Sequence, residues 1–242
     1  MGYLMLYAIG DIHGQSEQLD AALALILKDG GPDAEIVFLG DYIDRGPDSR
    51  GVLERLIFGR DAFKPWHFLL GNHDRMLTWY LKKIPIHDPH LFHGLHWLHP
   101  RMGGEKTLAS YGVDIEENRR SGEIHTEARD KIPKLHLDFL NSLNLFYDTP
   151  ELIFVHAGIR PGIKIEDQNI NDLLWIREGF IEDTRDHGRL IVHGHVALDK
   201  PTHFGNRIDL DGGAAYGRPL SPVVFEGKEC WVLTNKGRTK LK

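Results

Sequence analysis

Residues 36–46 read IVFLGDYIDRG, a short apolar run that passes through glycine into acidic side chains. Short apolar runs bounded by glycine are typical of buried β-strands. The same pattern recurs along the chain, and each run ends in aspartate, asparagine or histidine. The other four runs are Tyr3–Ile9 before GDIHG (10–14), Phe68–Leu70 before GNHD (71–74), Leu152–Val155 before HAG (156–158) and Leu190–Val192 before HGH (193–195).

Segments with helical spacing of apolar residues separate the first three predicted strands. Ser16–Lys28 and Ser49–Phe58 each carry apolar residues three or four positions apart. Alternation of strand and helix favours a parallel sheet and an α/β fold. In open α/β sheets, ligands bind beyond the carboxyl ends of the strands. We therefore expect the five polar strand ends to converge on one rim.

The remaining sequence predicts an insertion and a β-rich tail. The stretch of about 82–148 is rich in charge, histidine and helix formers and is interrupted by prolines, so we expect a mostly helical insertion beside the rim. Arg207–Leu210, Leu220–Phe225 and Cys230–Leu233 predict antiparallel strands that close a second sheet. No flexible linker is evident, and the prediction is one domain over residues 1–242.

Composition narrows the functional classes. The 242 residues are 41% hydrophobic and 26% charged, which predicts a large core, and the net charge of −6 argues against a nucleic-acid partner. The single cysteine, Cys230, excludes an internal disulfide and a Cys-based zinc site. The longest apolar runs are too short to cross a membrane, and the first residues lack signal-peptide features. We expect a cytoplasmic protein with no membrane partner.

The polar strand ends offer oxygen and imidazole ligands. This ligand set suits manganese, iron or zinc. Six such ligands suit two metal ions that share a carboxylate, an arrangement that drives in-line displacement at phosphorus. Each residue taken alone would fit a turn, a helix cap or a packed histidine, but their joint occurrence at five strand ends favours a metal centre. The predicted ligands are Asp11, His13, Asp41, Asn72, His156 and His195.

The motifs GDIHG, GDYIDRG, GNHD, HAG and HGH, in this order, resemble the phosphoprotein phosphatase family of metallophosphoesterases, and more narrowly its bacterial branch. GG at 103–104, TL at 107–108, SYG at 110–112 and LLWIR at 173–177 extend the resemblance. It implies a calcineurin-like, two-sheet β-sandwich flanked by helices. It also implies that Asp11 and His13 bind the first metal, that Asp41 bridges both, and that Asn72, His156 and His195 complete the second.

The resemblance also implies a catalytic set. Arg45 and Arg177 are expected to bind phosphate, because the planar guanidinium matches phosphate oxygens bidentately; Arg160 is a weaker candidate. His73 is expected to act as the general acid, oriented by Asp44, which favours the protonated imidazole. The attacking group would be a hydroxide shared by two divalent ions. Manganese is favoured by resemblance, although iron and zinc fit the same ligands.

The predicted activity is phosphomonoester hydrolysis, foremost as a serine/threonine protein phosphatase whose range extends to phosphotyrosine. Its partner would be a phosphoprotein, a phosphopeptide or a small phosphoester. The alternative is hydrolysis of dinucleoside polyphosphates such as diadenosine tetraphosphate; HVA at 195–197 mildly favours it, and LLWIR fits either. The net charge and the Asp-Arg-Gly motif argue against a nuclease. A catalytically inactive scaffold has no need for the complete set of residues. The oligomeric state is left open.

Five histidines recur at every third position in the predicted insertion: His87, His90, His93, His96 and His99. A continuous helix could align them as a metal-binding stripe. Proline and glycine within the segment argue against that helix, so we expect partly exposed histidines on irregular chain. Trp79 and Trp97 are interpreted as core residues, and Cys230 as packed.

Overall fold

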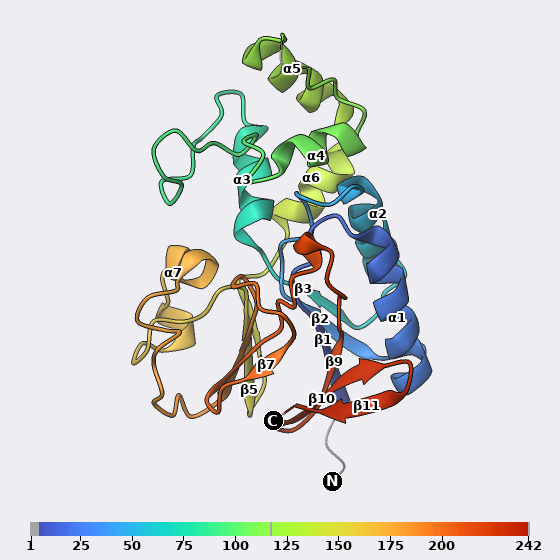
Figure 1. The fold of residues 1–242 in the computed structure, drawn as a ribbon, viewed down its shortest axis with the longest axis vertical. Coiled ribbons are helices and arrows are strands. Elements are labelled where there is room, and N and C mark those ends of the chain that lie inside the picture. The colour runs from blue at the N-terminus through green and yellow to red at the C-terminus, as the bar shows by residue number, and fades with distance from the viewer. Residues whose placement is uncertain (1–4, 117, 242) are drawn as a thin grey trace.

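A computed structural model describes residues 5–116 and 118–241, which form two sheets with helices around them (Figure 1). The first sheet has the strand order β11-β10-β9-β1-β2-β3 and the second β4-β5-β6-β8-β7. The predicted α/β, two-sheet architecture is confirmed. The strands are β1 (Met5–Ile9), β2 (Glu35–Phe38), β3 (Trp66–Phe68), β4 (Phe146–Asp148), β5 (Leu152–Val155), β6 (Leu190–His193), β7 (Thr202–His203), β8 (Arg207–Asp209), β9 (Val223–Glu226), β10 (Glu229–Thr234) and β11 (Gly237–Lys240).

The first sheet contains the predicted βαβαβ unit. Strand β1 pairs in parallel with β2, and β2 in parallel with β3. Helices α1 (Ser16–Gly30) and α2 (Ser49–Asp61) make the two crossovers. The strand expected at Phe68–Leu70 occupies Trp66–Phe68 instead. Of the strand expected at Tyr3–Ile9, the structure shows Met5–Ile9, and Tyr3 and Leu4 lie outside the described residues.

The two sheets pack against each other through alternate residues of β1. Leu6 and Ala8 join Phe154, Val192 and others in the core between the sheets. Tyr7 and Ile9 point the opposite way into the core beneath α1 and α2. Both faces of β1 are therefore buried, which explains why its sequence is continuously apolar rather than alternating.

The tail differs from the prediction. Only Arg207–Asp209 (β8) enters the second sheet, and it pairs in parallel with β6. Strand β9 pairs antiparallel with β1, and β10 and β11 follow as a meander, so these three strands extend the first sheet. The reason lies in the open edge of β1: Val223 and Phe225 fill the core between the sheets, while Val224 faces the helices.

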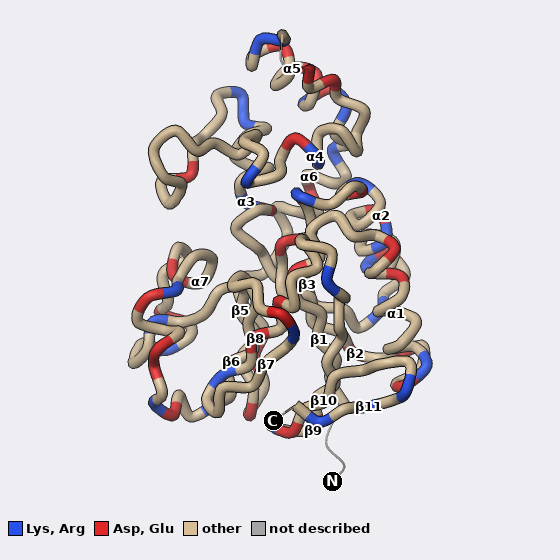
Figure 2. The backbone as a smooth tube through the Cα atoms, in the orientation of Figure 1, with Lys and Arg blue, Asp and Glu red and all other residues tan. Residues whose placement is uncertain are grey.

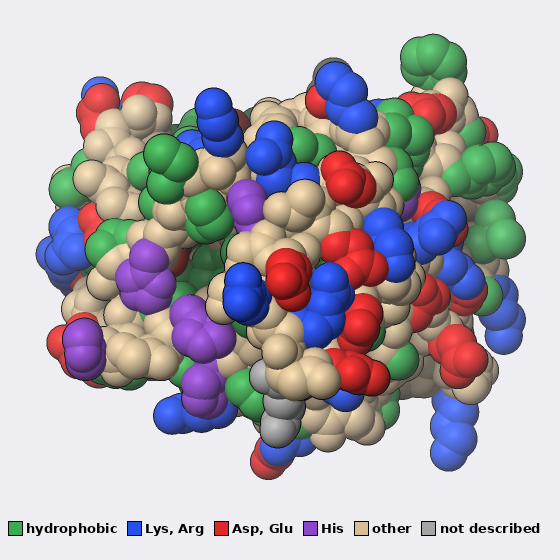
Figure 3. All heavy atoms as spheres, turned by 90° about the horizontal axis from the view of Figure 1, so that it is seen from above, with side chains coloured by type: hydrophobic (Ala, Val, Ile, Leu, Met, Phe, Trp, Pro, Cys, Tyr) green, Lys and Arg blue, Asp and Glu red, His purple; other side chains and the backbone are tan. Residues whose placement is uncertain are grey.

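The insertion is helical in part. Helix α3 (Asn72–Tyr80) leads into irregular chain, followed by α4 (Gly104–Ser110), α5 (Ser121–Lys131) and α6 (Lys134–Asn141). Its last residues form β4, an edge strand of the second sheet, which the sequence did not predict. The histidine repeat lies in the irregular segment, as expected. Figure 3 shows histidine side chains gathered mainly on one side of the face that it displays.

The shorter elements after β5 complete the second half of the molecule. The 3₁₀ turns are η1 (Ile165–Asp167) and η2 (Ala214–Tyr216), and α7 spans Ile170–Trp175. Positive and negative side chains are interspersed along the described chain (Figure 2). Within residues 5–116 and 118–241, no helix combines the length and apolar character needed to cross a membrane.

Candidate metal centre

The carboxyl ends of strands from both sheets meet at one rim, and the predicted ligands lie there. Five of the six are fully buried, and His195 is half-buried. They follow β1, β2 and β3 of the first sheet and β5 and β6 of the second. The structure therefore brings together all six residues that the strand-end pattern singled out: Asp11, His13, Asp41, Asn72, His156 and His195.

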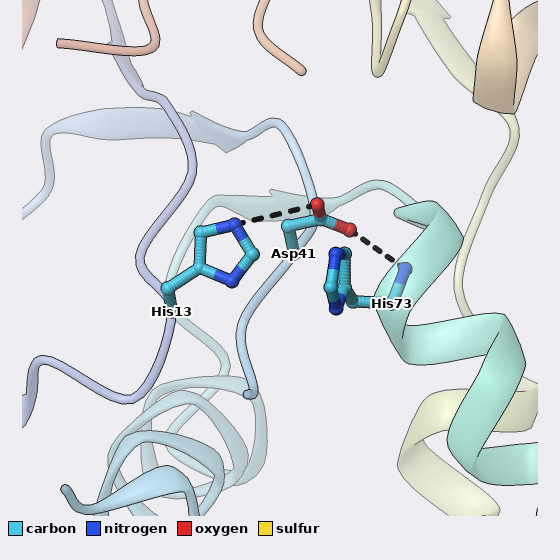
Figure 4. Close-up of side chains that lie close together, drawn as sticks. All are labelled: His13, Asp41 and His73. Atoms are coloured by element: carbon cyan, nitrogen blue, oxygen red, sulfur yellow. Dashed lines mark hydrogen bonds and ion pairs between the residues drawn. The ribbon is translucent and has the colours of Figure 1, made fainter. Parts of the chain in front are cut away.

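Asp41 lies at the middle of this set. One carboxylate oxygen is 3.6 Å from Nε2 of His13, and the other is 3.6 Å from Nε2 of His156. Ligand atoms of His13, Asp41 and His73 lie within 4.8 Å of one another, and so do those of Asp41, His156 and His195. Figure 4 shows the first group, with His13 and Asp41 facing each other. Two clusters that share one carboxylate are the arrangement expected of a two-metal site, but the first contains His73 where Asp11 was the predicted ligand.

The histidine rings are oriented as metal ligands usually are. His13 donates from Nδ1 to the carbonyl of Ile43 at 2.8 Å, and His156 donates from Nδ1 to that of Leu39 at 2.9 Å. Because a carbonyl only accepts, each Nε2 is left with its lone pair directed into the site. A backbone carbonyl on the second ring nitrogen is the usual support for a metal-binding histidine.

Three further features of the site are consistent with bound cations. Nε2 of His156 lies 2.9 Å from Oδ1 of Asn72, so two acceptor atoms face each other. Nε2 of His195 is buried without a hydrogen-bond partner. Burial, helped by the neighbouring carboxylates of Asp211 and Asp41, raises the pKa of Asp11 well above its usual range. Divalent ions would satisfy the lone pairs and compensate the crowded carboxylates.

Asp11 is held differently from the other ligands. Both of its carboxylate oxygens accept from the backbone N–H of His195, at 3.1 and 3.2 Å. It lies outside the two clusters of ligand atoms described above. The contact nevertheless ties the loop after β1 to the loop after β6, so Asp11 joins the two sheets at the rim.

The loops around the site are strained. Six non-glycine residues of the described chain have positive φ, and five of them belong to the predicted site: His13, Asp41, Asp44, Arg45 and His195. Such left-handed backbone is costly for ordinary side chains and collects at functional sites. Gly71 shows how close the loops approach, because a Cβ there would lie 2.1 Å from Oδ1 of Asp41. Any residue with a Cβ would collide with Asp41 here, so this contact requires glycine.

His73 and Asp44 form the predicted pair. Nδ1 of His73 is 2.6 Å from Oδ2 of Asp44, and both side chains are buried. Burial raises the pKa of Asp44 to about 7 and lowers that of His73 to about 3. Both shifts run against the expectation that Asp44 favours a protonated imidazole, and the protonation state of the pair stays a prediction. Burial disfavours the charged form of each group, so desolvation acts against an ion pair.

Two residues that hold Asp44 were missed by sequence reasoning. Thr107 donates to Oδ1 of Asp44 at 2.6 Å, and Nε1 of Trp97 donates to Oδ2 at 2.7 Å. Trp97 is buried, as predicted, but its indole N–H serves the site. The only signal in the sequence was the TL segment of the resemblance, which contains Thr107.

Asp74 supports the rim rather than the pair of His73 and Asp44. Its carboxylate accepts from the backbone N–H groups of Asp41, Tyr42 and Gly71 at 2.8, 3.0 and 3.0 Å. These bonds fix the loop after β2 to the start of α3. Asp74 therefore holds Asp41 in its strained conformation.

The arginines occupy distinct places. Arg45 donates to Nε2 of His13 at 2.8 Å and to Nε2 of His73 at 3.0 Å. Arg177 is exposed and lines the cavity above the rim. Arg160 instead forms an ion pair with Asp172 at 2.6 Å and does not line this cavity. The structure thus brings two of the three arginine candidates to the site.

The rim opens into a cavity of about 660 Å³. This volume is in the range of cavities that bind ligands of nucleotide size. Its walls include the irregular part of the insertion, the end of α7 and the turn η2. Four basic side chains line it, against the acidic Asp41 and Glu105: Arg45, Arg101, Lys106 and Arg177.

Fold and site together define a metal-dependent phosphoesterase. A family model described as calcineurin-like phosphoesterase matches residues 4–217, and the chain belongs to this family. It is 27% identical over 245 residues to the asymmetrical bis(5'-nucleosyl)-tetraphosphatase PrpE of Oceanobacillus iheyensis. That match covers 91% of this chain and 88% of the relative.

Two solved structures share the fold. One, provisionally assigned as a diadenosine tetraphosphatase, has a TM-score of 0.64 and 22% identity and covers 95% of this chain and 92% of its own. The other, a cold-active protein-tyrosine phosphatase of Shewanella sp., has a TM-score of 0.61 and 16% identity, with coverages of 100% and 81%. At these identities the likeness concerns the fold alone.

Proposed function

We propose that this enzyme hydrolyses dinucleoside polyphosphates of the diadenosine tetraphosphate type. The observation that carries the proposal is the match along about nine-tenths of both chains to a relative named as a bis(5'-nucleosyl)-tetraphosphatase. Support for the protein phosphatase expected first from the motifs is a likeness in fold to a structure of 16% identity. The alternative weighed beside it is therefore preferred, with the same site residues.

The cavity suits a polyphosphate chain. Its basic side chains outnumber the acidic ones, and the guanidinium groups of Arg45 and Arg177 match phosphate oxygens. A polyphosphate needs several cations along its length, whereas a phosphomonoester needs them at one point. Arg101 and Lys106, on the insertion, supply positive charge beside the rim.

The proposed mechanism assigns a role to each group. Asp11, His13, Asp41, Asn72, His156 and His195 would hold two divalent ions, with manganese preferred. When bound, these ions supply Lewis-acid stabilisation of the phosphoryl group and activate water for attack in line with the leaving oxygen. Arg45 and Arg177 bind the phosphate oxygens and orient the reacting phosphorus. To do this, Arg45 leaves its contacts with the imidazoles.

His73 manages the leaving group. Its Nε2 points to the site, and its Nδ1 contacts Asp44. Asp44, whose pKa burial raises to about 7, holds the ring through Nδ1. Once Arg45 has left Nε2, that nitrogen carries the proton of the neutral imidazole and passes it to the leaving oxygen, while the carboxyl proton of Asp44 moves to Nδ1. In a dinucleoside polyphosphate the leaving group is itself a phosphate, which is far less basic than the alkoxide released from phosphoserine. Proton delivery is therefore less demanding for the proposed substrate.

The test is a paired steady-state assay. Metal-stripped enzyme is reloaded with manganese and given diadenosine tetraphosphate or a phosphothreonine peptide, and kcat/KM is compared. We expect the value for the dinucleotide to be at least about tenfold higher, a difference of about 1.4 kcal/mol in transition-state binding. A higher value for the peptide would overturn the proposal in favour of a protein phosphatase. Asp41→Asn serves as the inactive control.

A further inference from the structure

Besides Trp175, which stacks on His90, the cavity is lined by two exposed aromatic side chains to which the proposed mechanism gives no role. Phe92 lies on the irregular segment between α3 and α4 and is 82% exposed. Tyr216, at the end of η2, is 62% exposed. Burying a large aromatic ring is favourable, so rings left open in a cavity are available to a ligand. Their faces offer stacking surfaces beside a phosphate-binding site.

The segment that carries Phe92 is braced. Buried Asp88 accepts from Arg75 of α3 at 2.8 Å and from the backbone N–H of His90 at 3.0 Å. The His90 ring stacks on Trp175 at the end of α7, with centroids 5.3 Å apart and planes 11° from parallel. In Figure 1 this segment and α7 lie on the same side of the molecule. The bracing means that the ring of Phe92 is presented on an ordered wall.

Tyr216 is placed beside the reacting end of the site. The guanidinium of Arg45 lies 5.8 Å from the centroid of its ring. Arg45 also contacts His13 and His73, so only the Arg45 side chain separates the Tyr216 ring from these two histidines at the rim. Phe92 and Tyr216 come from segments more than 100 residues apart in the sequence, yet they line one cavity.

We propose that Phe92 and Tyr216 are nucleobase platforms, each stacking on one base of a dinucleoside polyphosphate whose phosphate chain lies over the basic side chains between the bases. This inference rests on the proposed function and specifies how that substrate is recognised. Stacking on an aromatic ring accepts any base, because every base has a π-face. The two platforms therefore select for a nucleoside at each end of the chain rather than for adenine.

The test measures kcat/KM for diadenosine tetraphosphate and for inorganic tripolyphosphate, which has the phosphate chain without bases. For Phe92→Ala and Tyr216→Ala we expect losses on the dinucleotide of about tenfold each, mainly as a higher KM, and smaller losses on tripolyphosphate. Phe92→Trp and Tyr216→Phe, which keep a ring, should recover most of the loss. Phe63→Ala is the matched control, since Phe63 is 94% exposed and lies outside the cavity.

Binding gives a second readout. The Kd of a non-hydrolysable, methylene-bridged dinucleoside tetraphosphate, measured by calorimetry, should rise by the same factor in the two alanine variants. Two results would overturn the stacking role of Phe92 and Tyr216 but leave the proposed function standing. One is an equal loss on both substrates, and the other is wild-type binding and hydrolysis of the dinucleotide by the alanine variants. A wild-type enzyme that does not hydrolyse the dinucleotide would overturn the proposed function itself.

Discussion

The rim and the insertion hold their functional side chains by opposite means. At the rim, each ligand follows a buried strand, and backbone N–H groups or carbonyls fix its orientation, as between Asp11 and His195 or His156 and Leu39. The irregular part of the insertion has no sheet beneath it and is fixed by a few side chains, among them Asp88 and Trp97. Under the proposed function, the rim would carry out the chemistry, and the insertion would select the substrate and support the pair of His73 and Asp44.

The largest effect is expected at the rim, from Asp41→Asn. Asparagine tolerates the positive φ of 51° and keeps the oxygen that accepts from the backbone N–H of His73. It removes the charge that both ligand clusters share. We expect kcat/KM to fall on the order of 10⁴-fold with an unchanged circular dichroism spectrum and less than full metal content by mass spectrometry. Full activity would eliminate the two-metal arrangement.

The next effect depends on the leaving group. His73→Asn removes the proton donor, and general acids contribute about 10²–10⁴-fold. We expect a loss of about 10³-fold on a phosphothreonine peptide, whose alkoxide needs a proton, and a clearly smaller loss on diadenosine tetraphosphate, whose leaving group is a phosphate. The ratio of the two losses is the measurement. Equal losses would show that His73 does not act by protonating the leaving oxygen.

In the insertion, Asp88→Asn should loosen the braced segment. The side chain of Asp88 is fully buried, and the ion pair with Arg75 is nearly so. Breaking a buried pair leaves an uncompensated charge and costs about 3–5 kcal/mol, an upper bound here because asparagine keeps one acceptor. Faster hydrogen exchange of residues 88–95, with unchanged exchange in β1 and β2, would locate the effect. A global loss of protection would mean that the insertion and the rim unfold together.

Trp97→Phe tests one of the two contacts described above between the insertion and Asp44. The substitution keeps a buried ring and removes the N–H that donates to Asp44. Losing a group that orients a catalytic side chain typically costs 10- to 100-fold. Because Thr107 still holds the other oxygen of Asp44, we expect the low end, about tenfold in kcat with little change in KM. Phe139→Leu, a core change away from Asp44, is the control. An unchanged kcat would leave Trp97 a core residue only.

The same contrast explains what the sequence could predict. The rim ligands are found from sequence because each follows its own strand within a few residues, so a local pattern contains them. Thr107 and Trp97 lie 63 and 53 residues from Asp44, and only the folded insertion brings them there. The positive φ of Asp41 is equally invisible, because it results from the bonds that Asp74 makes to the neighbouring loop.

The main error in the predicted fold concerns which sheet the strands of the tail join. The runs around Val223 and Cys230 were recognised as strands, but their assignment to the second sheet was wrong. Which sheet a strand joins depends on which edge is open, and that is decided by β1, more than 200 residues earlier. Strand β4 was missed because its three residues, Phe146–Asp148, lie at the end of a helical stretch and are too few to show the period of a strand.

The smallest expected effect concerns pH and the base of the insertion. His136 of α6 is buried, and its Nδ1 accepts from the hydroxyl of Tyr111 at 2.7 Å. Burial lowers its pKa below the usual value of 6.5; of the smaller contributions, Glu54 raises the pKa and Arg50 lowers it further. The unfolded chain therefore binds more protons below pH 6.5, so the stabilisation by neutral His136 is complete above that pH and is lost as the pH falls towards the folded pKa. His136→Gln keeps an acceptor for Tyr111 and does not titrate.

Urea unfolding at pH 7.5 and 5.5 should show a smaller pH-dependent drop in the free energy of unfolding for the variant than for the wild type. Equal drops would mean that His136 is protonated as readily in the folded protein as in the unfolded chain, and that this part of the insertion is as open to water as its irregular segment.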